Sequence, residues 1–472
     1  MVTMSDYEDL DGFGVMSGEE LDDLNKALTA GDSVNPPASL TPGDAFALRM
    51  ESLEDTLHVI TYEMEHLRLY KSLIAQPAYN TVEEYNRLHA YGNNPDAGWI
   101  EDGDLPEEDD STYERVHVKV KFLATTRSVK HAATLINTAH GPAIGQETAN
   151  GTMHLLRMLE RGLFYGDSNL SALQFDGFRR MILDNSNADN IIDMRGKPLS
   201  QDVLEDACLT ISDAPNYGRA TNFHCNPKVI ADLAKTFFPK ERHDTHSNEP
   251  NVSWGRTIGG WVSQSGPVQF EPNPFIWVGG APVAAAQGDA SKIPGTPTIS
   301  TALAASVDAA SQFTASDAGS YTYSVKACNR YGKSAVVSLG AALAIAAGQK
   351  ATVGMTPAGA QAVDWYELYR SKPGATALSL IDRIPNAAGV GEQVLTDLNA
   401  NLPFTSDGFL FQQNNQGMGL KQLAPMMKVP LAVINLRIRW IQLIYCVPEL
   451  YAPNRHVLFR NIGRAANYVG AP

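Results

Sequence analysis

The sequence predicts an α+β protein whose host fold is interrupted by an inserted all-β domain. Three observations support this class: a helix-forming leucine pattern near residue 155, strongly apolar strands over residues 429–462, and a stretch between them rich in Ala, Gly, Ser and Thr. A chain of 472 residues is too long for one ordinary core, so we expect two to four folding units.

The charge distribution separates an acidic leader from a mildly basic body. Residues 1–114 hold 26 acidic and 5 basic side chains, a net charge of −21, so the other 358 residues carry +6. We expect residues 1–40 to be a flexible leader that serves solubility, intramolecular masking or assembly control, with at most a short helix at 18–28. This asymmetry does not favour a sequence-reading nucleic-acid protein, which would concentrate basic residues in one patch.

The chain start has neither the basic residues nor the apolar run of a signal peptide, and no later stretch is long and apolar enough to span a membrane. The four cysteines form no CxxC pair, so we expect no disulfide framework and no cysteine-based zinc site. These features predict a soluble protein made in a reducing cytoplasm.

An amphipathic arm follows the leader. Five apolar residues step by four, three, four and three positions on a helix predicted from Thr41 to about Ala75: Leu53, Leu57, Ile60, Met64 and Leu67. A seam of this kind needs a partner surface.

Residues 113–129 alternate between apolar and polar side chains, which predicts a strand with one polar face. Lys119 and Lys121 lie on that polar face, and Lys130 follows the strand. We expect a two-stranded ribbon that projects from the body.

The helix near residue 155 is the predicted spine of the fold. Four leucines recur at three- and four-residue steps and define its packed face: Leu155, Leu156, Leu159 and Leu163. Arg157, Glu160 and Arg161 are expected on the polar side. The run from Gly166 to Ser168 predicts a turn through a left-handed backbone position, which would end the helix near Phe164.

A compact α+β unit follows, with a helix at 200–212 capped by Ser200, a strand at 220–224 and a helix at 228–237. Residues 239–274 are expected to form long ordered loops, and residues 274–280 one more strand.

The insert spans residues 281–402 and has equal numbers of acids and bases, eight of each. Short strands at 320–327, 335–339, 365–370 and 378–384 predict a small β-sandwich. The segment YTYSVKACNRYGKSA resembles a strand and turn of immunoglobulin or fibronectin type III domains. The late apolar strands must then return to the host core.

Catalytic chemistry has weak support in the sequence. Ser168 lies in GDSNL, which echoes the nucleophile block of GDSL-type esterases, but it follows a helix and lacks the partner Asp-x-x-His block. His224, Cys225, His243 and His246 match no compact zinc spacing. No phosphate or dinucleotide fingerprint is present, so we expect no cofactor, no metal and no catalytic residue.

Five segments together carry a resemblance to a known family: LRLYKSL (67–73), QPAYNTVEEYNRLHAYGN (76–93), VKVKFLATTRSV (118–129), FYGDSNL (164–170) and QFDGFRRMI (174–182). In this order they resemble the major capsid proteins of large contractile-tailed bacteriophages, which have the Hong Kong 97 capsid fold and can carry an immunoglobulin-like insertion. The resemblance covers nearly the whole chain outside the insert.

The resemblance implies a division of the chain into the domains of that fold. These are a leader at 1–40, an N-terminal arm at 41–108, an extended loop at 109–139, a peripheral domain at 140–199 and 431–472, an axial domain at 200–284 and 403–430, and the inserted immunoglobulin-like domain at 285–402.

The resemblance also implies function and partners. Such subunits assemble with themselves as hexamers and pentamers into an icosahedral head that encloses double-stranded DNA, in the host cytoplasm and then in the virion. Scaffold, portal, head protease and decoration proteins are implied partners, and a membrane is not. Lys119, Lys121 and Lys130 are expected at inter-subunit contacts without covalent cross-linking. Two alternatives stay open: an esterase using Ser168, and an adhesin or glycan-binding protein acting through the insert.

Overall fold

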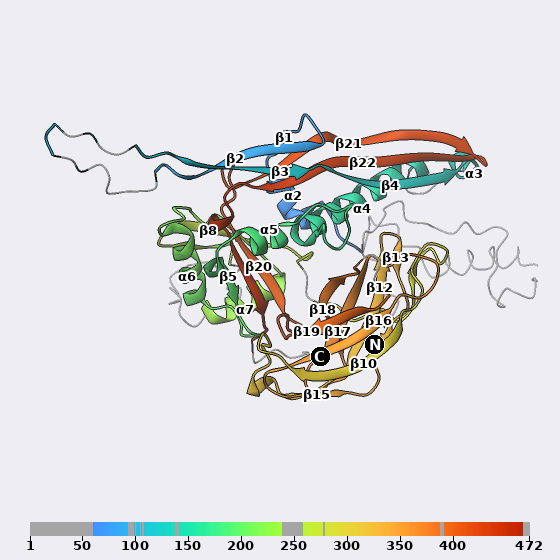
Figure 1. The fold of residues 1–472 in the computed structure, drawn as a ribbon. Helices are drawn as coiled ribbons and strands as arrows, with labels where there is room; N and C mark the ends of the chain where they lie inside the picture. Colours follow the sequence, from blue (N-terminus) through green and yellow to red (C-terminus); the bar gives the residue numbers. More distant parts are fainter. Residues whose placement is uncertain are drawn as a thin grey trace, which may run out of the picture.

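The computed structural model describes residues 60–92, 108–136, 141–237, 258–276, 279–387 and 391–465, with positions 99, 101–103 and 105. Two sheets with flanking helices form the host, a two-stranded hairpin projects from it, and an all-β unit lies beside the long helix (Figure 1). This arrangement confirms the predicted α+β class with a β insert. Within the described part of the chain, no helix is long and apolar enough to cross a membrane.

The first sheet joins strands from opposite ends of the chain. Its order is β1 (Ala75–Pro77), β21 (Met418–Ile434), β22 (Arg437–Leu450) and β4 (Lys121–Lys130), with only β1 parallel to its neighbour. Helix α4 (Ala143–Tyr165) lies along one face of this sheet (Figure 1). The contact includes the Gln442 side chain, whose Nε2 donates to the carbonyl oxygen of Thr148 at 2.8 Å.

Helix α4 is the spine that the leucine pattern predicts, and it ends one residue later than expected. The structure buries all four leucines of the predicted packed face. Three of them, Leu155, Leu159 and Leu163, form part of one hydrophobic core with Phe164, Phe178 and Ile444. Glu160 was wrongly assigned to the polar face, because it is fully buried in this core.

The end of α4 does not use the predicted left-handed turn. Gly166 has φ −58°, a value that any residue can adopt, so its backbone conformation does not require glycine. Glycine is required instead because neighbouring backbone atoms leave no space for a Cβ. Its N–H donates to the Gly162 carbonyl at 2.8 Å, and the Gly177 N–H donates to the Gly166 carbonyl at 2.9 Å. A Cβ on Gly177 would lie 2.7 Å from the Gly162 carbonyl oxygen. Two backbones therefore cross in contact where α5 (Phe178–Asn185) begins.

The second sheet is covered on both faces. Its order is β5 (Ile191–Asp193), β23 (Val457–Ile462), β20 (Ser406–Phe411), β6 (Asn222–Cys225), β8 (Gly266–Pro272) and β7 (Gly260–Ser263). In β20, Phe409 and Phe411 enter the core beneath α4, whereas Leu410 enters the core against α6 (Gln201–Ser212) and α7 (Pro227–Phe237). Alternation along one strand thus joins the two host cores.

The connections around the second sheet differ in part from expectation. The Ser200 hydroxyl caps α6, as predicted, by accepting the Val203 N–H. The predicted loops at 239–274 include the β7–β8 hairpin, and residues 238–257 lie outside the described part. The predicted strand at 274–280 is wrong where it is described, since residues 274–276 form a turn with Ile276 buried.

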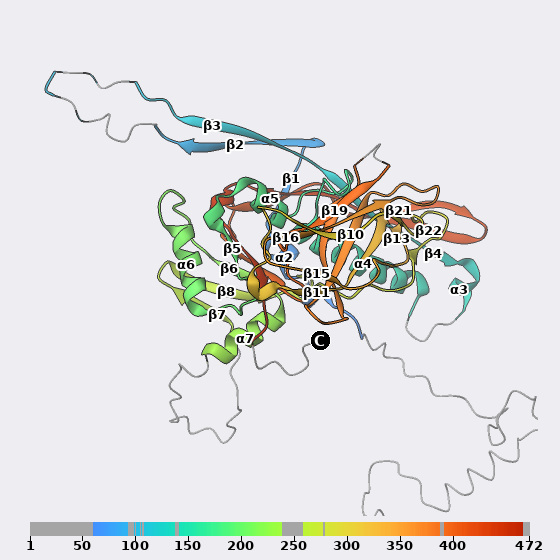
Figure 2. The same cartoon turned by 60° about the horizontal axis from the view of Figure 1, so that its bottom comes forward.

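The projecting ribbon exists, but its partner strand was not foreseen. Strand β2 (Val82–Ala90), which we placed in the arm, pairs antiparallel with β3 (Thr112–Lys119). The predicted single strand at 113–129 breaks at buried Val120, after which β4 enters the first sheet. Both views show the β2–β3 hairpin standing clear of the body (Figures 1 and 2).

The C-terminal strands cross the predicted domain boundary. Residues 418–430 were assigned to the axial domain, yet they continue through β21 in the first sheet. Strand β23 was assigned to the peripheral domain, yet it pairs with β20 in the second sheet. The reason is that β21 and β22 pair with each other from Met418 and Leu450 to Ile434 and Arg437. This continuous hairpin keeps residues 418–430 in the same sheet as the residues that follow them.

The insert contains two larger sheets around its own core. One sheet has the order β10 (Thr298–Val307), β16 (Gln349–Thr356) and β19 (Gln393–Asp397). The other is built on β18 (Leu378–Pro385), β17 (Trp365–Ser371) and β12 (Tyr323–Asn329), and a smaller pair links β11 (Gly319–Tyr321) to β15 (Leu343–Ile345). The core includes Tyr323, Val325, Tyr366 and Leu368. Its immunoglobulin type stays a prediction.

Candidate assembly surfaces

The candidate nucleophile Ser168 lies in the crossing after α4. Its backbone N–H donates to the Asp176 Oδ1 at 2.8 Å, and its hydroxyl has no hydrogen-bond partner among the described residues. A serine esterase needs a base in contact with that hydroxyl. The geometry therefore does not support the esterase alternative.

The candidate zinc residues that the structure describes are packing residues. His224 is fully buried, and its ring centroid lies 5.6 Å from that of Phe411. Burial lowers the pKa of His224 to about 4, and its Nε2 lies 3.3 Å from the Gln413 Oε1. The Cys225 thiol is also buried, which raises its pKa. His243 and His246 lie outside the described residues, and no cluster of three potential metal ligands occurs in the described part.

The predicted arm seam is only partly described. Leu53 and Leu57 lie outside the described residues. Ile60 is fully exposed, Met64 is half exposed and Leu67 is fully buried, so the three do not share one packed face. The predicted continuous helix is wrong here, because the chain forms a short 3-10 turn at Met64–His66, then α2 (Arg68–Ser72), and then β1.

A buried carboxylate holds α2 against the spine. The Glu160 Oε1 accepts the Leu69 N–H at 2.9 Å, and its Oε2 accepts the Tyr70 N–H at 2.9 Å. The Asn273 side chain also donates to Oε1, at 2.6 Å. Burial raises the pKa of Glu160, although these hydrogen bonds act in the opposite direction. Glu160 therefore satisfies the free N–H groups at the start of α2 and ties the arm to the host.

We expect Glu160→Ala to release residues 67–73 from the spine. The substitution leaves two backbone N–H groups and one amide without their acceptor, which should cost about 2–4 kcal/mol. Hydrogen exchange at Leu69 and Tyr70 should become faster, as measured by mass spectrometry. The matched control is Glu147→Ala on the same helix, where the lost ion pair to Arg127 is partly exposed and contributes about 0–1 kcal/mol. Unchanged exchange at Leu69 and Tyr70 would contradict this role.

The β2–β3 hairpin is anchored to the body through two side chains in the middle of β2. The Tyr85 hydroxyl and the Arg87 Nη2 both donate to the Leu450 carbonyl, at 3.1 and 2.8 Å. Beyond this anchor, Leu88 pairs with Tyr113 across the hairpin, and both side chains are exposed. An apolar pair on a two-stranded ribbon has no layer of its own chain to cover it among the described residues.

The three lysines predicted at inter-subunit contacts lie in different places. Lys119 ends β3 on the hairpin and is exposed. Lys121 begins β4, and its ammonium donates to the Ala172 carbonyl of the same chain at 2.5 Å. Lys130 ends β4 at the far end of the first sheet. The hairpin thus carries only Lys119, and the role of each lysine between subunits stays a prediction.

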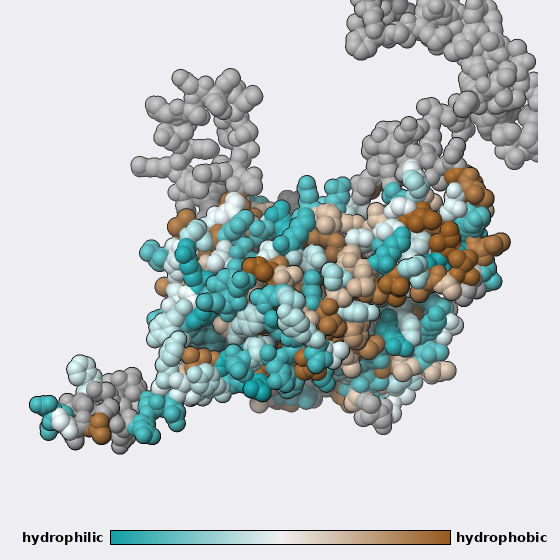
Figure 3. Space-filling model, turned by 90° about the horizontal axis from the view of Figure 1, so that it is seen from above, coloured by the Kyte–Doolittle hydropathy of each residue, from teal (hydrophilic) through white to brown (hydrophobic). Residues whose placement is uncertain are grey.

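A second exposed apolar surface lies at the far end of the first sheet. We call it the tip patch, and define it by the exposed apolar side chains of α3 (His131–Leu135), the next residue, the end of β21, and the β21–β22 turn. They are 41–75% exposed: Leu135, Ile136, Leu431, Val433 and Leu436. Figure 3, seen from above the sheet, shows apolar residues gathered at this end.

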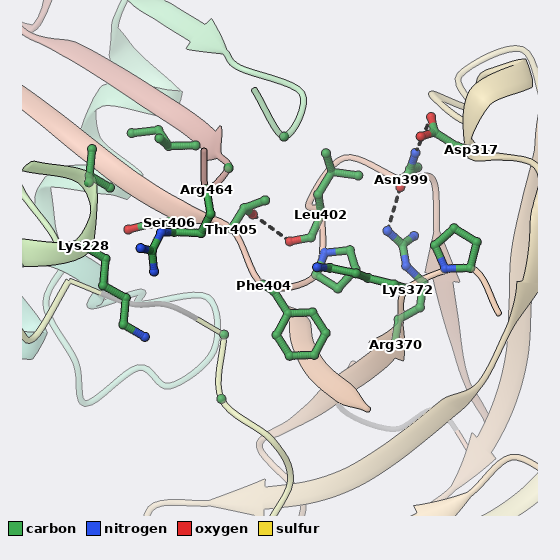
Figure 4. A pocket seen from close by; sticks show the side chains of 18 of the residues that line it. Lys228, Asp317, Arg370, Lys372, Asn399, Leu402, Phe404, Thr405, Ser406 and Arg464 are labelled. Carbon is green, nitrogen blue, oxygen red and sulfur yellow. Dashed lines mark hydrogen bonds between the residues drawn. The ribbon is translucent and has the colours of Figure 1, made fainter. Parts of the chain in front are cut away.

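A cavity of about 670 Å³ lies where the insert joins the host (Figure 4). Lys228 of α7 and Lys372 of the insert enter it from different walls, and Lys372 lies over the Phe404 ring at 5.3 Å. Most of its other charges are paired: Arg370 with Asp397, and Arg464 with Asp232. The cavity is therefore mainly a junction, closed by contacts between the insert and the returning chain.

The burial of Glu160 and the exposure of the tip patch are not predicted from the sequence. Glu160 follows the packed Leu159, and nothing in the neighbouring sequence indicates that its carboxylate is buried. Its hydrogen-bond partners are distant in the sequence: the backbone of residues 69 and 70 and the side chain of Asn273. The tip patch had a signal, because apolar residues alternate at Val429, Leu431 and Val433 before a two-residue turn.

Comparisons with known proteins support one family. No family model matches the chain. The major capsid protein of Staphylococcus phage K is 25% identical over 457 residues, which cover 93% of this chain and 95% of that protein. The putative major capsid protein of Enterococcus phage phiEF24C is 24% identical over 467 residues, with the same coverages.

Solved structures are also similar in outline. The capsid of a native GTA particle matches with a TM-score of 0.47 and 8% identity, covering 92% of this chain and 100% of that chain. The capsid of Myoviridae phage XM1 matches with a TM-score of 0.43 and 9% identity, covering 89% and 99%. The resemblance predicted from five short segments is thus confirmed by the curated relatives, and the chain resembles phage major capsid proteins along almost its entire length.

Proposed function

We propose that this protein is the major capsid protein of a tailed phage, a structural subunit that assembles with copies of itself into the virion head. The observation that carries the proposal is the end-to-end match to phage major capsid proteins, over 93% of this chain and 95% of the relative. A match of that extent covers most of the host and most of the insert rather than one shared module.

The distribution of exposed apolar surface supports a role in assembly. The exposed Leu88–Tyr113 pair of the hairpin and the side chains of the tip patch belong to neither host core, and they lie at opposite ends of the first sheet (Figure 1). Neither is covered by another described element of the same chain. Contact with neighbouring subunits would bury both surfaces and supply stability that the isolated chain lacks.

The finer features of this function extend the proposal. Hexamers and pentamers of the subunit would tile an icosahedral shell around double-stranded DNA, and assembly would take place in the host cytoplasm. The mildly basic body would meet packaged DNA through phosphate charge alone, without sequence preference. Scaffold, portal, head protease and decoration proteins are proposed partners, and glycan binding through the insert stays a prediction.

The hairpin provides a test of this proposal at one residue. We expect Leu88→Asp to block assembly while leaving the melting temperature of the dispersed chain nearly unchanged, because Leu88 is exposed in the monomer. Sedimentation velocity separates assembled from dispersed protein. The matched control is Val307→Asp on the exposed face of the insert, which should assemble normally. Normal assembly of Leu88→Asp would contradict a hairpin contact between subunits.

A further inference from the structure

The tip patch is surrounded by charge of one sign. A hollow of about 690 Å³ at this end is lined by Lys130, His131, Arg437 and Arg439 together with Leu135 and Leu436, and no acidic residue lines it. Lys130, Arg437 and Arg439 form no ion pair with any described residue. A partner for this surface should therefore combine apolar side chains with carboxylates.

The backbone beneath the patch is held in an unfavourable conformation. Asn435 and Leu436 both have φ 55°, a left-handed region that asparagine tolerates and leucine disfavours. The Leu436 carbonyl accepts the His131 N–H at 2.9 Å, which fixes α3 beside the turn. Leu436 is nevertheless 75% exposed, so a costly turn presents an apolar side chain to solvent. An exposed leucine on a strained turn is expected where its side chain packs against a binding partner.

The acidic leader has the matching chemistry. Residues 1–40 hold 9 acidic side chains and 1 basic side chain. Within them, residues 18–28 read GEELDDLNKAL, where Leu21, Leu24 and Leu28 recur at helical spacing between four carboxylates. Leucines at three- and four-residue steps are the usual anchors of a helix that binds an apolar groove. The basic residues around the tip patch would face the carboxylates.

The leader can reach the tip patch of its own chain. Tyr62 packs on Phe275 and lies beneath Arg157, which is on α4. From Arg157 to the start of α4 at Ala143, beside the tip, the helix spans about 20 Å at 1.5 Å per residue. The residues between 28 and 60 span up to roughly 100 Å when extended. No second copy is needed for the contact.

We propose that residues 18–28 bind the tip patch of the same chain and mask it until neighbouring subunits replace them. The masking consequence rests on the proposed shell function, whereas the contact itself does not. The leader would thereby delay association through this surface, and its displacement or removal would expose Leu436 and its neighbours.

Disulfide trapping in the full chain tests the contact directly. The four native cysteines are all buried, so introduced thiols should react selectively. We compare the pair Leu24→Cys with Leu436→Cys against the control pair Leu24→Cys with Val262→Cys, in the dispersed fraction under mild oxidation. Val262 is 76% exposed on β7, which matches the 75% of Leu436. Mass spectrometry of digests identifies the bond and whether it joins one chain or two.

We expect the Leu436 pair to form an intramolecular bond at least about tenfold faster than the Val262 pair, because docking raises the local thiol concentration. Adding Arg437→Glu and Arg439→Glu should remove that advantage. Equal rates for the two pairs would overturn the proposal, and so would a bond formed mainly between two chains. If the Leu436 pair is trapped selectively but negative-stain electron microscopy shows no shell, the result supports the contact and contradicts the shell function.

Discussion

Leu159→Asp is expected to abolish folding of the host and, with it, soluble assembly. Leu159 is fully buried on α4, in the core that also contains Phe409 of the second sheet and Ile444 of the first. A carboxylate placed there has no partner, and it removes a leucine that joins the helix to both sheets. We expect a loss of more than about 4 kcal/mol, enough to leave the chain in the insoluble fraction.

Two controls separate this effect from a general intolerance of the helix. Met158→Asp introduces the same charge one residue earlier, where the side chain is partly exposed, and should leave the chain soluble. Ser168→Ala, beyond the helix end, should be nearly neutral. The measurements are the soluble yield and the melting temperature. A soluble Leu159→Asp with a normal melting temperature would contradict the spine assignment.

Arg370→Ala should strongly destabilise the insert while the stability of the host stays unchanged. The Arg370 guanidinium is buried in β17, where its Nη1 pairs with Asp397 and its Nη2 donates to the Asn399 Oδ1 at 2.7 Å. Burial alone would lower the pKa of Arg370, but the charge of Asp397 raises it above its usual range. Removing the cation leaves the buried Asp397 carboxylate with the Tyr323 hydroxyl and the Asn399 N–H as its donors among the described residues, which typically costs about 3–5 kcal/mol.

Calorimetry of the full chain can measure this loss of stability in the insert separately from the host, because the insert has its own core. We expect the transition of the insert to move to lower temperature and the transition of the host to stay in place. Arg330→Ala provides the matched control, since that exposed guanidinium mainly stacks on Tyr331 at 4.6 Å. Equal thermograms for the two variants would show that the buried pair does not hold the insert together.

Local sequence patterns predicted the elements whose burial follows from spacing. The leucines of α4, the Ser200 cap of α6 and the β17 and β18 strands of the insert all lie where periodicity and turn residues place them. In each case the signal is contained within about 20 residues, a range in which helical and strand periods are readable. The family resemblance came from the order of such segments along the chain.

The missed features depend on contacts between distant parts of the chain. Strand β2 reads as a polar, irregular segment, and only its pairing with β3 across a long loop makes it a ribbon. Glu160 is buried because residues 69, 70 and 273 supply donors to it. Gly166 suggested a left-handed turn, whereas it is required by the close approach of Gly177. No local pattern encodes these partners.

As a shell subunit, the chain must bury its hairpin and its tip patch between copies of itself. Negative-stain electron microscopy of the purified full-length protein at increasing concentration tests this requirement most directly. We expect closed shells, tubes or hexameric rings, and their loss in Leu88→Asp but not in Val307→Asp. A dispersed monomer at the highest concentration, with the hairpin still exposed, would contradict it.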